Sequence, residues 1–285
     1  MTDAITEGDS ARGWHRSMIY VVPFNERHVA SAYASEVDAV VLELEDAVAL
    51  SRKEDARRAA AEILASRPEK PTYVRINPVG TGLTLADIEA VATPNLEGVR
   101  LAKTESAADV VGVGWALDEL GSSAGIQVLL ETARGISNME AAVAAHPRVM
   151  AVGIGEQDLQ ADLGVDEVGF DYMRSKVIIA ARSAGLPAPW QGVWVDLNDM
   201  EGLRRSTVKG KRTGFFGRTA IHPTQVPIIN EVFTPTEEEV ARAEEMVAAL
   251  EAAKKEGVAG LRMSDGTFID NAVVLAAQRT LAFRP

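Results

Sequence analysis

The sequence predicts an α/β protein, in which a TIM (β/α)8 barrel is followed by a C-terminal helical extension. Short apolar runs alternate with helical patterns from about residue 17 to residue 222, as repeated β–α units require. The runs are apolar at consecutive positions, which is typical of parallel strands covered on both faces. A doubly wound open sheet is the alternative, but no glycine-rich dinucleotide-binding turn follows the first run.

Eight runs are predicted to be the strands of the barrel. They are SMIYVV (17–22), AVVLELE (39–45), TYVRIN (72–77), GVRLA (98–102), GIQVLLE (125–131), VMAVGIG (149–155), GVWVD (192–196) and GFFGRTAI (214–221). Helical patterns occupy several intervals between them, at residues 52–66, 84–92, 138–146 and 170–185. The first of these helices is amphipathic, because Ala59, Ile63 and Leu64 share one face and charged residues surround the other.

The barrel pattern stops near residue 229, and the last part of the chain has a different organisation. Residues 234–257 predict a long acidic helix, with Thr234 or Thr236 as its N-cap and a glycine after its end. MSDGTFID (263–270) predicts a hairpin around its Asp-Gly pair, and residues 271–283 predict a last amphipathic helix.

Three segments follow from these patterns. Residues 1–15 are polar and acidic and are predicted to be a disordered leader. Residues 16–230 are predicted to form the catalytic barrel domain. The tail, residues 231–285, is too small to fold alone, so its apolar faces are expected to pack on the barrel or on a neighbouring subunit.

Composition excludes several classes of function. The 285 residues are 47% hydrophobic and 25% charged, which is ordinary for a soluble enzyme, and the net charge of −12 argues against a general nucleic-acid-binding surface. The chain has no cysteine and four histidines, so a metal would be held mainly by oxygen ligands, which favours Mg²⁺ or Mn²⁺. No apolar run has the length of a membrane span and no signal peptide is evident, so we expect a cytoplasmic protein.

Candidate functional residues come from the carboxyl ends of the predicted strands, where a barrel of this kind carries its reactive groups. In chain order the polar residues at these ends are Glu45, Asp46, Arg75, Asn77, Lys103, Glu131, Glu156, Asp158, Asp196 and His222.

Glu131 and Asp158 are the strongest pair among these candidates. They follow two successive predicted strands, and two carboxylates at neighbouring strand ends can bind one hard divalent cation. The alternative is that each carboxylate caps the N-terminus of the following helix. We favour the metal for the pair, because the chain offers few other ligands.

Arg75 ends an apolar strand, so its guanidinium is expected at the barrel mouth, where it would bind a substrate carboxylate or stabilise a developing enolate. A buried ion pair with Glu45 or Asp46 is the alternative, and both can hold at once. His222 followed by a proline is most simply a structural turn, and Lys103 is either a rim charge or a substrate contact. A Schiff-base lysine has no support in the sequence.

Several motifs in order resemble the β-subunit of citrate lyase and the malyl-CoA and citramalyl-CoA lyases of the HpcH/HpaI aldolase superfamily. The resemblance covers roughly residues 16 to 282. Its motifs are RSMIYVVP, LEDAVALSRKEDAR, YVRIN, LLETARGISN, GEQDLQADLG, GRTAIHPTQ and DGTFIDNAVV.

The resemblance implies a Mg²⁺-dependent lyase that cleaves or forms a carbon–carbon bond in a 3-hydroxyacyl-CoA, giving acetyl-CoA or a homologue and an α-keto acid. It implies Glu131 and Asp158 as metal ligands and Arg75 as the residue that binds the acid and stabilises the enolate. Asp270 is implied as an acid/base residue delivered to a neighbouring subunit of a homotrimer. The predicted catalytic set is Arg75, Asp270, Glu45 and Asp46, and the predicted substrate-binding set is Arg75, Asn77, Arg16, Lys103 and His222.

The chain departs from the family pattern at several positions. Phe24 stands where a glycine is usual, Ser31 where a lysine is usual, and Ala102 where a proline is usual. Gln157 replaces a glutamate, and Gln191 and Phe216 each replace an aspartate. The first-strand changes fall where relatives accommodate CoA, so an aldolase acting on free hydroxy-keto acids and a CoA-thioester hydrolase remain alternatives. A non-catalytic binding subunit is a further alternative, although it would be expected to lose Glu131, Asp158 or Arg75.

Overall fold

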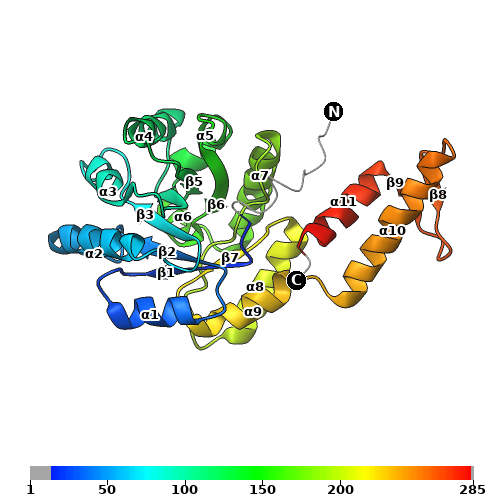
Figure 1. Cartoon of the computed structure of the whole chain (residues 1–285), viewed down its shortest axis with the longest axis horizontal. Coiled ribbons are helices and arrows are strands. Elements are labelled where there is room, and N and C mark those ends of the chain that lie inside the picture. The colour runs from blue at the N-terminus through cyan, green and yellow to red at the C-terminus, as the bar shows by residue number, and fades with distance from the viewer. Residues whose placement is uncertain (1–13, 284–285) are drawn as a thin grey trace. The chain divides into compact units, whose positions relative to one another are not determined.

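A parallel sheet forms the centre of the larger of two units (Figure 1). The computed structural model describes residues 14–283, and the chain divides between Glu231 and Val232 into these units. Seven strands within residues 14–231 pair in the order β6-β5-β4-β3-β2-β1-β7. They are β1 (Ser17–Val21), β2 (Ala39–Glu43), β3 (Thr72–Ile76), β4 (Gly98–Leu101), β5 (Gly125–Leu130), β6 (Val149–Ile154) and β7 (Arg218–Ala220).

Helices surround this sheet on its outer face (Figure 1). Each connection between neighbouring parallel strands needs a crossover, and a helix usually supplies it. The helices of the larger unit are α1 (Glu26–Ala34), α2 (Lys53–Ala65), α3 (Thr84–Val91), α4 (Ala107–Glu119), α5 (Ala133–Val143), α6 (Glu156–Leu163), α7 (Phe170–Ser183) and α8 (Met200–Thr213). A further helix, α9 (Val226–Phe233), and short 3-10 turns at Leu50–Arg52, Glu167–Gly169 and Pro223–Gln225 complete the connections.

The strands are buried on both faces, as their continuous apolar sequences predict. All five residues of β2 are buried. One cluster of buried side chains occupies the concave side of the sheet, and it draws on β1, β2, β3, β5 and β6; its buried members are Met18, Ala39, Val41, Tyr73, Leu129, Ala151 and Trp190.

The sheet is strongly curved. Strands β4 and β7 are four places apart in the strand order, which would separate them by about 19 Å in a flat sheet. Nevertheless Arg100 on β4 donates a hydrogen bond to the Thr219 hydroxyl on β7 across 3.2 Å. Side chains of distant strands therefore meet on the concave side.

The seventh of the eight predicted strands, residues 192–196, is wrong. In its place single parallel bridges join Gly153 of β6 to Trp190 and Gln191 to Arg218 of β7. The chain leaves this alignment at Gly192, and Val195 is 54% exposed, so the apolar run GVWVD is not covered on both faces as a core strand would be. Closure of the seven strands into a complete (β/α)8 barrel therefore stays a prediction.

The smaller unit contains the predicted long helix, hairpin and final helix, as α10 (Glu237–Lys255), β8 (Gly260–Arg262) paired antiparallel with β9 (Phe268–Asp270), and α11 (Asn271–Ala282). Thr236 caps α10, and the hairpin begins three residues before its predicted range. A cluster of Leu250, Met263, Ile269 and Val274 joins these elements.

Two further predictions concern the ends of the chain and membranes. Residues 1–13 of the predicted leader lie outside the described residues, whereas His15 is buried and its Nε2 lies 2.9 Å from the Tyr73 hydroxyl oxygen. Within residues 14–283, no helix has the length and apolar character needed to cross a membrane.

Candidate active site

A cavity of about 190 Å³ opens where the parallel strands of the larger unit end. Because all seven strands run in one direction, residues at or just after their carboxyl ends meet at one edge of the sheet. The lining of this cavity includes Tyr20, Arg75, Glu131, Asp158, Trp190 and Thr219.

Glu131 directly follows the last residue of β5 and lines this cavity, although only 2% of the residue is exposed. It does not cap the next helix, because the Thr132 side chain accepts the hydrogen bond from the Gly135 N–H. Glu131 Oε1 accepts instead from the backbone N–H of Lys103 at 2.8 Å. Its side chain also packs on Gly155, where an added Cβ would lie 2.4 Å from Oε2.

Asp158 reaches the same cavity from the first turn of α6. The N-cap of that helix is Gly155, which has no side chain to satisfy the first N–H groups. Burial raises the pKa of Glu131 to about 8; the Arg75 cation opposes this shift, and the nearby Asp158 carboxylate adds to it. The two carboxylates therefore concentrate negative charge in a poorly solvated place.

The donor set suits a hard divalent cation. Mg²⁺ is usually bound through one or two carboxylates, with water and substrate completing its six positions. No group of three or more histidine or acidic side chains that could hold a metal occurs within residues 14–283. Glu131 and Asp158 thus fit an ion that keeps several positions for water and substrate, and a cation would relieve the charge repulsion between them.

Arg75 lies in a dense arrangement of charges between β2 and β3. Its Nε donates to Glu43 Oε2 at 2.5 Å, and its Nη2 lies 3.4 Å from Glu45 Oε2. The guanidinium also lies 4.5 Å from the centre of the Tyr20 ring. The buried ion pair predicted as an alternative is thus present, with Glu43 as an additional partner, and Arg75 still lines the cavity.

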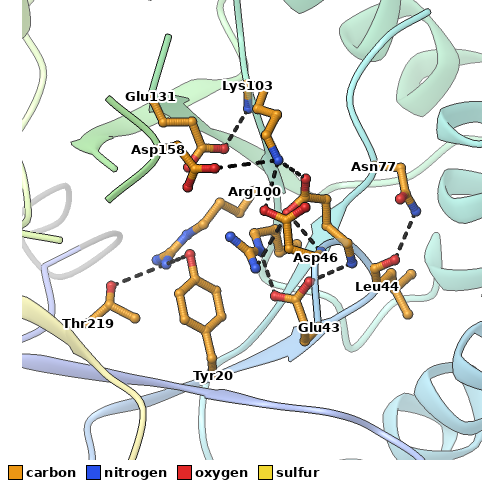
Figure 2. A network of polar contacts seen from close by, with 12 residues as sticks. Tyr20, Glu43, Leu44, Asp46, Asn77, Arg100, Lys103, Glu131, Asp158 and Thr219 are labelled. Carbon is orange, nitrogen blue, oxygen red and sulfur yellow. Dashed lines mark hydrogen bonds and ion pairs between the residues drawn. The ribbon is translucent and has the colours of Figure 1, made fainter. Parts of the chain in front are cut away.

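Lys103 connects the acidic residues of the LEDAV motif with the candidate metal pair (Figure 2). Its ammonium contacts Glu45, lies 2.8 Å from Asp46 Oδ2 and lies 3.8 Å from Asp158 Oδ1. Although burial opposes the shift, the hydrogen bonds to Asp46 and Glu45 raise the pKa of Lys103. Its backbone has φ of 46°, a conformation that costs a non-glycine residue free energy, and this turn directs its N–H to Glu131.

Glu45 and Asp46 respond differently to Lys103. Burial raises the pKa of Glu45, although Arg75 and Lys103 oppose the shift. Partial burial acts to raise the pKa of Asp46, but the hydrogen bonds with Lys103 and Glu45 and the charges of Lys103 and Arg75 together outweigh it, so the pKa is lowered. Asp46 lines the cavity, and the Glu45 carboxylate forms ion pairs with both Arg75 and Lys103.

Three predicted substrate-binding residues lie elsewhere in the larger unit. Asn77 is buried, and its side-chain amide is already bonded to Lys53, Asp87 and the Leu44 carbonyl. Arg16 precedes β1, at the opposite edge of the sheet, and pairs with Asp38 at 2.7 Å. His222 caps the turn Pro223–Gln225 and lines a second cavity, of about 370 Å³, with Tyr20, Arg27, His28, Ser31 and Ile221.

Asp270 belongs to the smaller unit. It ends β9 and caps α11, and its Oδ1 accepts hydrogen bonds from the N–H groups of Ala272 and Val273. Its implied role at a neighbouring subunit's site stays a prediction.

The other strand-end candidates and the departures from the family pattern are also placed. Asp196 is exposed and bonds the N–H of Asn198. Glu156 Oε1 accepts from Arg174 Nε at 2.6 Å, so its carboxylate is directed to α7.

The departures from the family pattern lie in different surroundings. Gln157 lines the main cavity, and Ala102 is buried. Phe24 packs under Arg52, Gln191 donates to the Ser206 carbonyl, and Phe216 contacts Trp14.

Sequence reasoning missed the part of the cavity wall that comes from within the strands. Tyr20, Trp190 and Thr219 line the cavity, and Arg100 lies fully buried behind them. Only the charged Arg100 inside the apolar run GVRLA offered a signal, because a buried arginine requires polar partners.

Comparisons with known proteins indicate the family of this chain. Residues 16–223 match the HpcH/HpaI aldolase/citrate lyase family. The (3S)-malyl-CoA thioesterase of Cereibacter sphaeroides is 34% identical over 273 residues, which cover 94% of this chain and 93% of that protein. The citrate lyase subunit beta of Leuconostoc mesenteroides is 32% identical over 279 residues, which cover 93% of this chain and 92% of that protein.

Solved structures give the same result. The crystal structure of CitE from Mycobacterium tuberculosis in complex with magnesium, acetoacetate and coenzyme A aligns with a TM-score of 0.77 and 29% identity, over 95% of this chain and 98% of that chain. The crystal structure of RipC from Yersinia pestis aligns with a TM-score of 0.66 and 28% identity, over 79% of this chain and 97% of that chain. The chain therefore belongs to the HpcH/HpaI aldolase/citrate lyase family.

Proposed function

We propose that this protein is a Mg²⁺-dependent carbon–carbon lyase that acts on a 3-hydroxyacyl-CoA of the malyl-CoA or citramalyl-CoA type. The observation that carries the proposal is the convergence of Glu131, Asp158 and Arg75 on one cavity. Two carboxylates for a cation and one arginine for an acid are what cleavage to an α-keto acid requires. CitE, the structural neighbour, was crystallised with magnesium and coenzyme A, which supports the same ligands here.

The reaction we propose breaks one carbon–carbon bond. It removes one proton from the 3-hydroxyl group and adds one proton to C2. The 3-hydroxyl group loses its proton, the C2–C3 bond breaks, and C3 becomes the carbonyl carbon of the α-keto acid. The bonding pair passes to C2 and the thioester carbonyl, giving an enolate. Protonation of C2 then gives the shorter acyl-CoA. A group that stabilises the enolate more than the bound substrate accelerates this step.

Arg75 is suited to hold the substrate carboxylate and to stabilise negative charge as it develops. Glu43 and Glu45 fix the guanidinium, so little reorganisation is needed during the reaction. Its planar fork also favours carboxylate geometry. In this proposal Glu45 and Asp46 act through Arg75 and Lys103, whose positions they hold.

Glu131 and Asp158 would hold the Mg²⁺ ion. When bound, the ion supplies positive charge that polarises the hydroxyl and carboxylate oxygens of the substrate. Asp270 is proposed to take and return the proton from a neighbouring subunit, in a homotrimer whose barrel closes as a complete (β/α)8 ring. The protein would carry out this reaction in the cytoplasm.

A thioester hydrolase is the second candidate, and a specific observation favours it. The Cereibacter protein with 34% identity is named as a (3S)-malyl-CoA thioesterase. In that reaction water attacks the thioester carbonyl, the C–S bond breaks, and a free acid and the CoA thiol result. The same cavity would serve either reaction, because both stabilise negative charge on the thioester oxygen.

The products formed from the acyl-CoA substrate separate the two candidates. Purified full-length protein with Mg²⁺ is supplied with malyl-CoA, citramalyl-CoA and the corresponding free acids. Release of an α-keto acid together with an acyl-CoA supports the lyase, whereas release of free CoA thiol and the intact hydroxy acid supports the hydrolase. Turnover of the free acids alone contradicts both.

Glu131→Gln supplies the control for the metal. Glutamine keeps the size of the side chain and an oxygen that can accept from the Lys103 N–H, but it removes the negative charge. We expect kcat/KM to fall by at least about 100-fold, comparable to losing one strong electrostatic contact in a transition state. Removal of the metal with EDTA should have the same effect on the wild type, and full activity in EDTA would refute the proposed role of Mg²⁺.

A further inference from the structure

Lys53 is a buried lysine at the start of α2, close to the candidate site but outside its cavity. The residue is only 8% exposed and does not line the main cavity. Its ammonium donates to the Leu44 carbonyl at 2.6 Å, to the Glu45 carbonyl at 2.7 Å and to Asn77 Oδ1 at 2.7 Å. An ammonium has three donors, so all of them are used within the protein. Lys53 therefore has no N–H group left with which to bind a ligand.

The two carbonyl groups that Lys53 binds lie on either side of Glu45 in the chain. The Leu44 carbonyl belongs to the peptide group before the Glu45 Cα atom, and the Glu45 carbonyl belongs to the peptide group after it. When both peptide groups are held, the φ and ψ angles of Glu45 are restricted, and with them the direction of its Cα–Cβ bond. The Lys53 ammonium thus determines where the Glu45 carboxylate can reach.

Glu45 and Asp46 are the residues that hold the two cations of the site. Glu45 Oε2 lies 3.4 Å from Arg75 Nη2, and the same carboxylate contacts the Lys103 ammonium. Asp46 Oδ2 lies 2.8 Å from that ammonium. The backbone of Asp46 directly follows the second carbonyl that Lys53 binds. A change in this backbone would therefore displace the carboxylates on which both cations depend.

A buried network holds Lys53 itself in place. Asn77, which accepts from Lys53, also donates to the Leu44 carbonyl at 2.9 Å (Figure 2). The side-chain and backbone N–H groups of Asn77 donate to Asp87 Oδ2, at 2.6 and 2.8 Å. Asp87 is fully buried, and its Oδ1 accepts from Arg57 Nε at 2.7 Å. The position of Lys53 is therefore determined by α2, by α3 and by the end of β3 together.

Lys70 makes the same kind of contact at the other end of β2. Its ammonium donates to the Ser35 carbonyl at 2.6 Å and to the Val37 carbonyl at 2.9 Å. These carbonyls precede β2, whereas the carbonyls that Lys53 binds follow it, at the edge of the sheet that carries the cavity. Both lysines hold a loop next to β2, but only Lys53 holds a loop that contains residues of the site.

We propose that Lys53 is a positioning residue of the reaction, which acts by fixing the backbone around Glu45. Through Glu45 it sets the positions of the Arg75 guanidinium and the Lys103 ammonium at the cavity. The inference rests on the proposed function, since it takes Arg75 to act on the acyl-CoA substrate. Lys53 itself does not touch the substrate, so its loss changes the rate through the placement of other groups. A misplacement of about 1 Å can lower a rate by about 100-fold.

The first test compares Lys53→Met with Lys70→Met, which is its matched control. Turnover of malyl-CoA and citramalyl-CoA by the full-length protein with saturating Mg²⁺ gives kcat and KM, and urea unfolding gives the stability. Both variants should unfold at a lower urea concentration, by up to about 1 M, because each loses hydrogen bonds to backbone carbonyls.

The kinetic constants separate the two lysines. Lys53→Met should lower kcat by about 10- to 100-fold and change KM by less than about threefold, since misplaced cations weaken stabilisation of the enolate more than binding of the substrate. Lys70→Met should keep kcat and KM within about twofold of the wild type. Full activity in Lys53→Met, or equal losses of kcat in the two variants, would overturn the proposal.

A double-mutant cycle with Glu45→Gln tests whether Lys53 acts through Glu45. Glutamine keeps the size of the side chain but removes the charge that contacts both cations. If Lys53 acts through this carboxylate, Lys53→Met should lower kcat by less than about threefold in the Glu45→Gln background. A general structural role makes the two losses of kcat multiply instead, and multiplied losses would overturn the proposal.

Lys53→Gln takes the place of Lys53→Met if the latter does not fold. Its side chain is shorter and has only two N–H donors, so it cannot reproduce the three hydrogen bonds of the ammonium. The same loss of kcat and the same result of the cycle are expected, and full activity would overturn the proposal. Absence of Mg²⁺-dependent cleavage of an acyl-CoA by the wild type contradicts the proposed function, whereas an active wild type with multiplied losses contradicts the inference alone.

Discussion

Two arginines on neighbouring strands occupy the wall of the same cavity in opposite electrostatic surroundings. Arg75 on β3 and Arg100 on β4 are paired in register, so their side chains leave the same face of the sheet. Arg75 is bonded to Glu43 and lies next to Glu45. Arg100 contacts Tyr20, Thr219, Gln127, Trp190 and Met18, all of which are neutral.

The difference shows how one sheet can place two kinds of cation in one site. The charge of Arg75 is balanced, so its main contribution is a guanidinium held in a fixed orientation. The charge of Arg100 is not balanced, so its contribution is an electric field and two oriented hydroxyls. Variants of the two arginines should therefore differ in their effects on stability as well as on ligand binding.

The largest expected effect is that of Arg75→Met. This change leaves the buried Glu43 carboxylate without its guanidinium partner, and breaking a buried pair from one side typically costs about 3–5 kcal/mol. Urea unfolding followed by circular dichroism should show this loss. Arg75→Met combined with Glu43→Gln is the control and should recover part of it. A cost below about 1 kcal/mol would mean that Glu43 does not depend on Arg75.

The next effect is a loss of stability at acid pH that involves His15. Burial lowers the pKa of His15 from 6.5 to about 4, with a further contribution from the Arg100 charge, while Asp38 and Glu97 oppose the shift. Between these values the unfolded chain binds a proton that the folded chain does not. The free energy of unfolding should therefore fall as the pH falls from 6.5 to 4, by up to about 3 kcal/mol.

Urea unfolding at pH 7 and at pH 4.5 checks this expectation. His15→Gln removes the titrating group, so the variant should lose less stability than the wild type between the two pH values. Equal losses in the two proteins would show that carboxylates elsewhere account for the acid sensitivity.

A smaller loss of stability is expected for Arg100→Met. The Tyr20 and Thr219 hydroxyls can turn to the cavity, so only the buried side-chain oxygen of Gln127, Oε1, is left without its partner. This costs about 1–3 kcal/mol, and removal of an unpaired buried charge offsets part of it. The same unfolding measurement should therefore place Arg100→Met between the wild type and Arg75→Met. A larger loss than that of Arg75→Met would contradict the proposed difference between the two arginines.

The smallest expected effect is electrostatic. Because the Arg100 charge contributes to lowering the pKa of His15, Arg100→Met should raise that pKa by a fraction of a pH unit. Titration of the His15 ring by NMR measures it. Arg75→Lys, which retains the charge and lies outside the interactions that shift His15, is the control and should leave the pKa unchanged.

The strand-end residues of the site could be predicted from the sequence because they interrupt apolar runs. Glu131 and Asp158 follow β5 and β6, and Arg75 lies at the end of β3, where parallel strands carry functional groups. Strand-end chemistry suggested their roles, and the resemblance to the family implied the same ones. Asp270 was predicted from the resemblance alone, and its position in the smaller unit gives no test of its role.

The remaining part of the site could not be predicted, because it depends on which side chains of each strand point to the concave side of the sheet. Tyr20 and Thr219 lie inside apolar strands and have no distinctive spacing. Asn77 was selected as a strand-end residue, yet its amide is bonded within the buried network of Lys53 and Asp87. The run at residues 192–196 has the apolar composition of a strand but lacks cover on both faces, so composition alone overestimated the sheet.

The sequence by itself therefore determined the α/β class, seven of the strands, some of the helices between them, and the carboxylates and arginine at the strand ends. Local apolar patterns are sufficient for these features, since each buried strand appears in the sequence as a short apolar run. Only the tertiary structure decided that Arg100 reaches across the sheet to Tyr20 and Thr219, and that Arg75 shares its charge with Glu43. The physical reason is the curvature of the sheet, which brings residues as far apart in sequence as 100 and 219 into contact on its concave side.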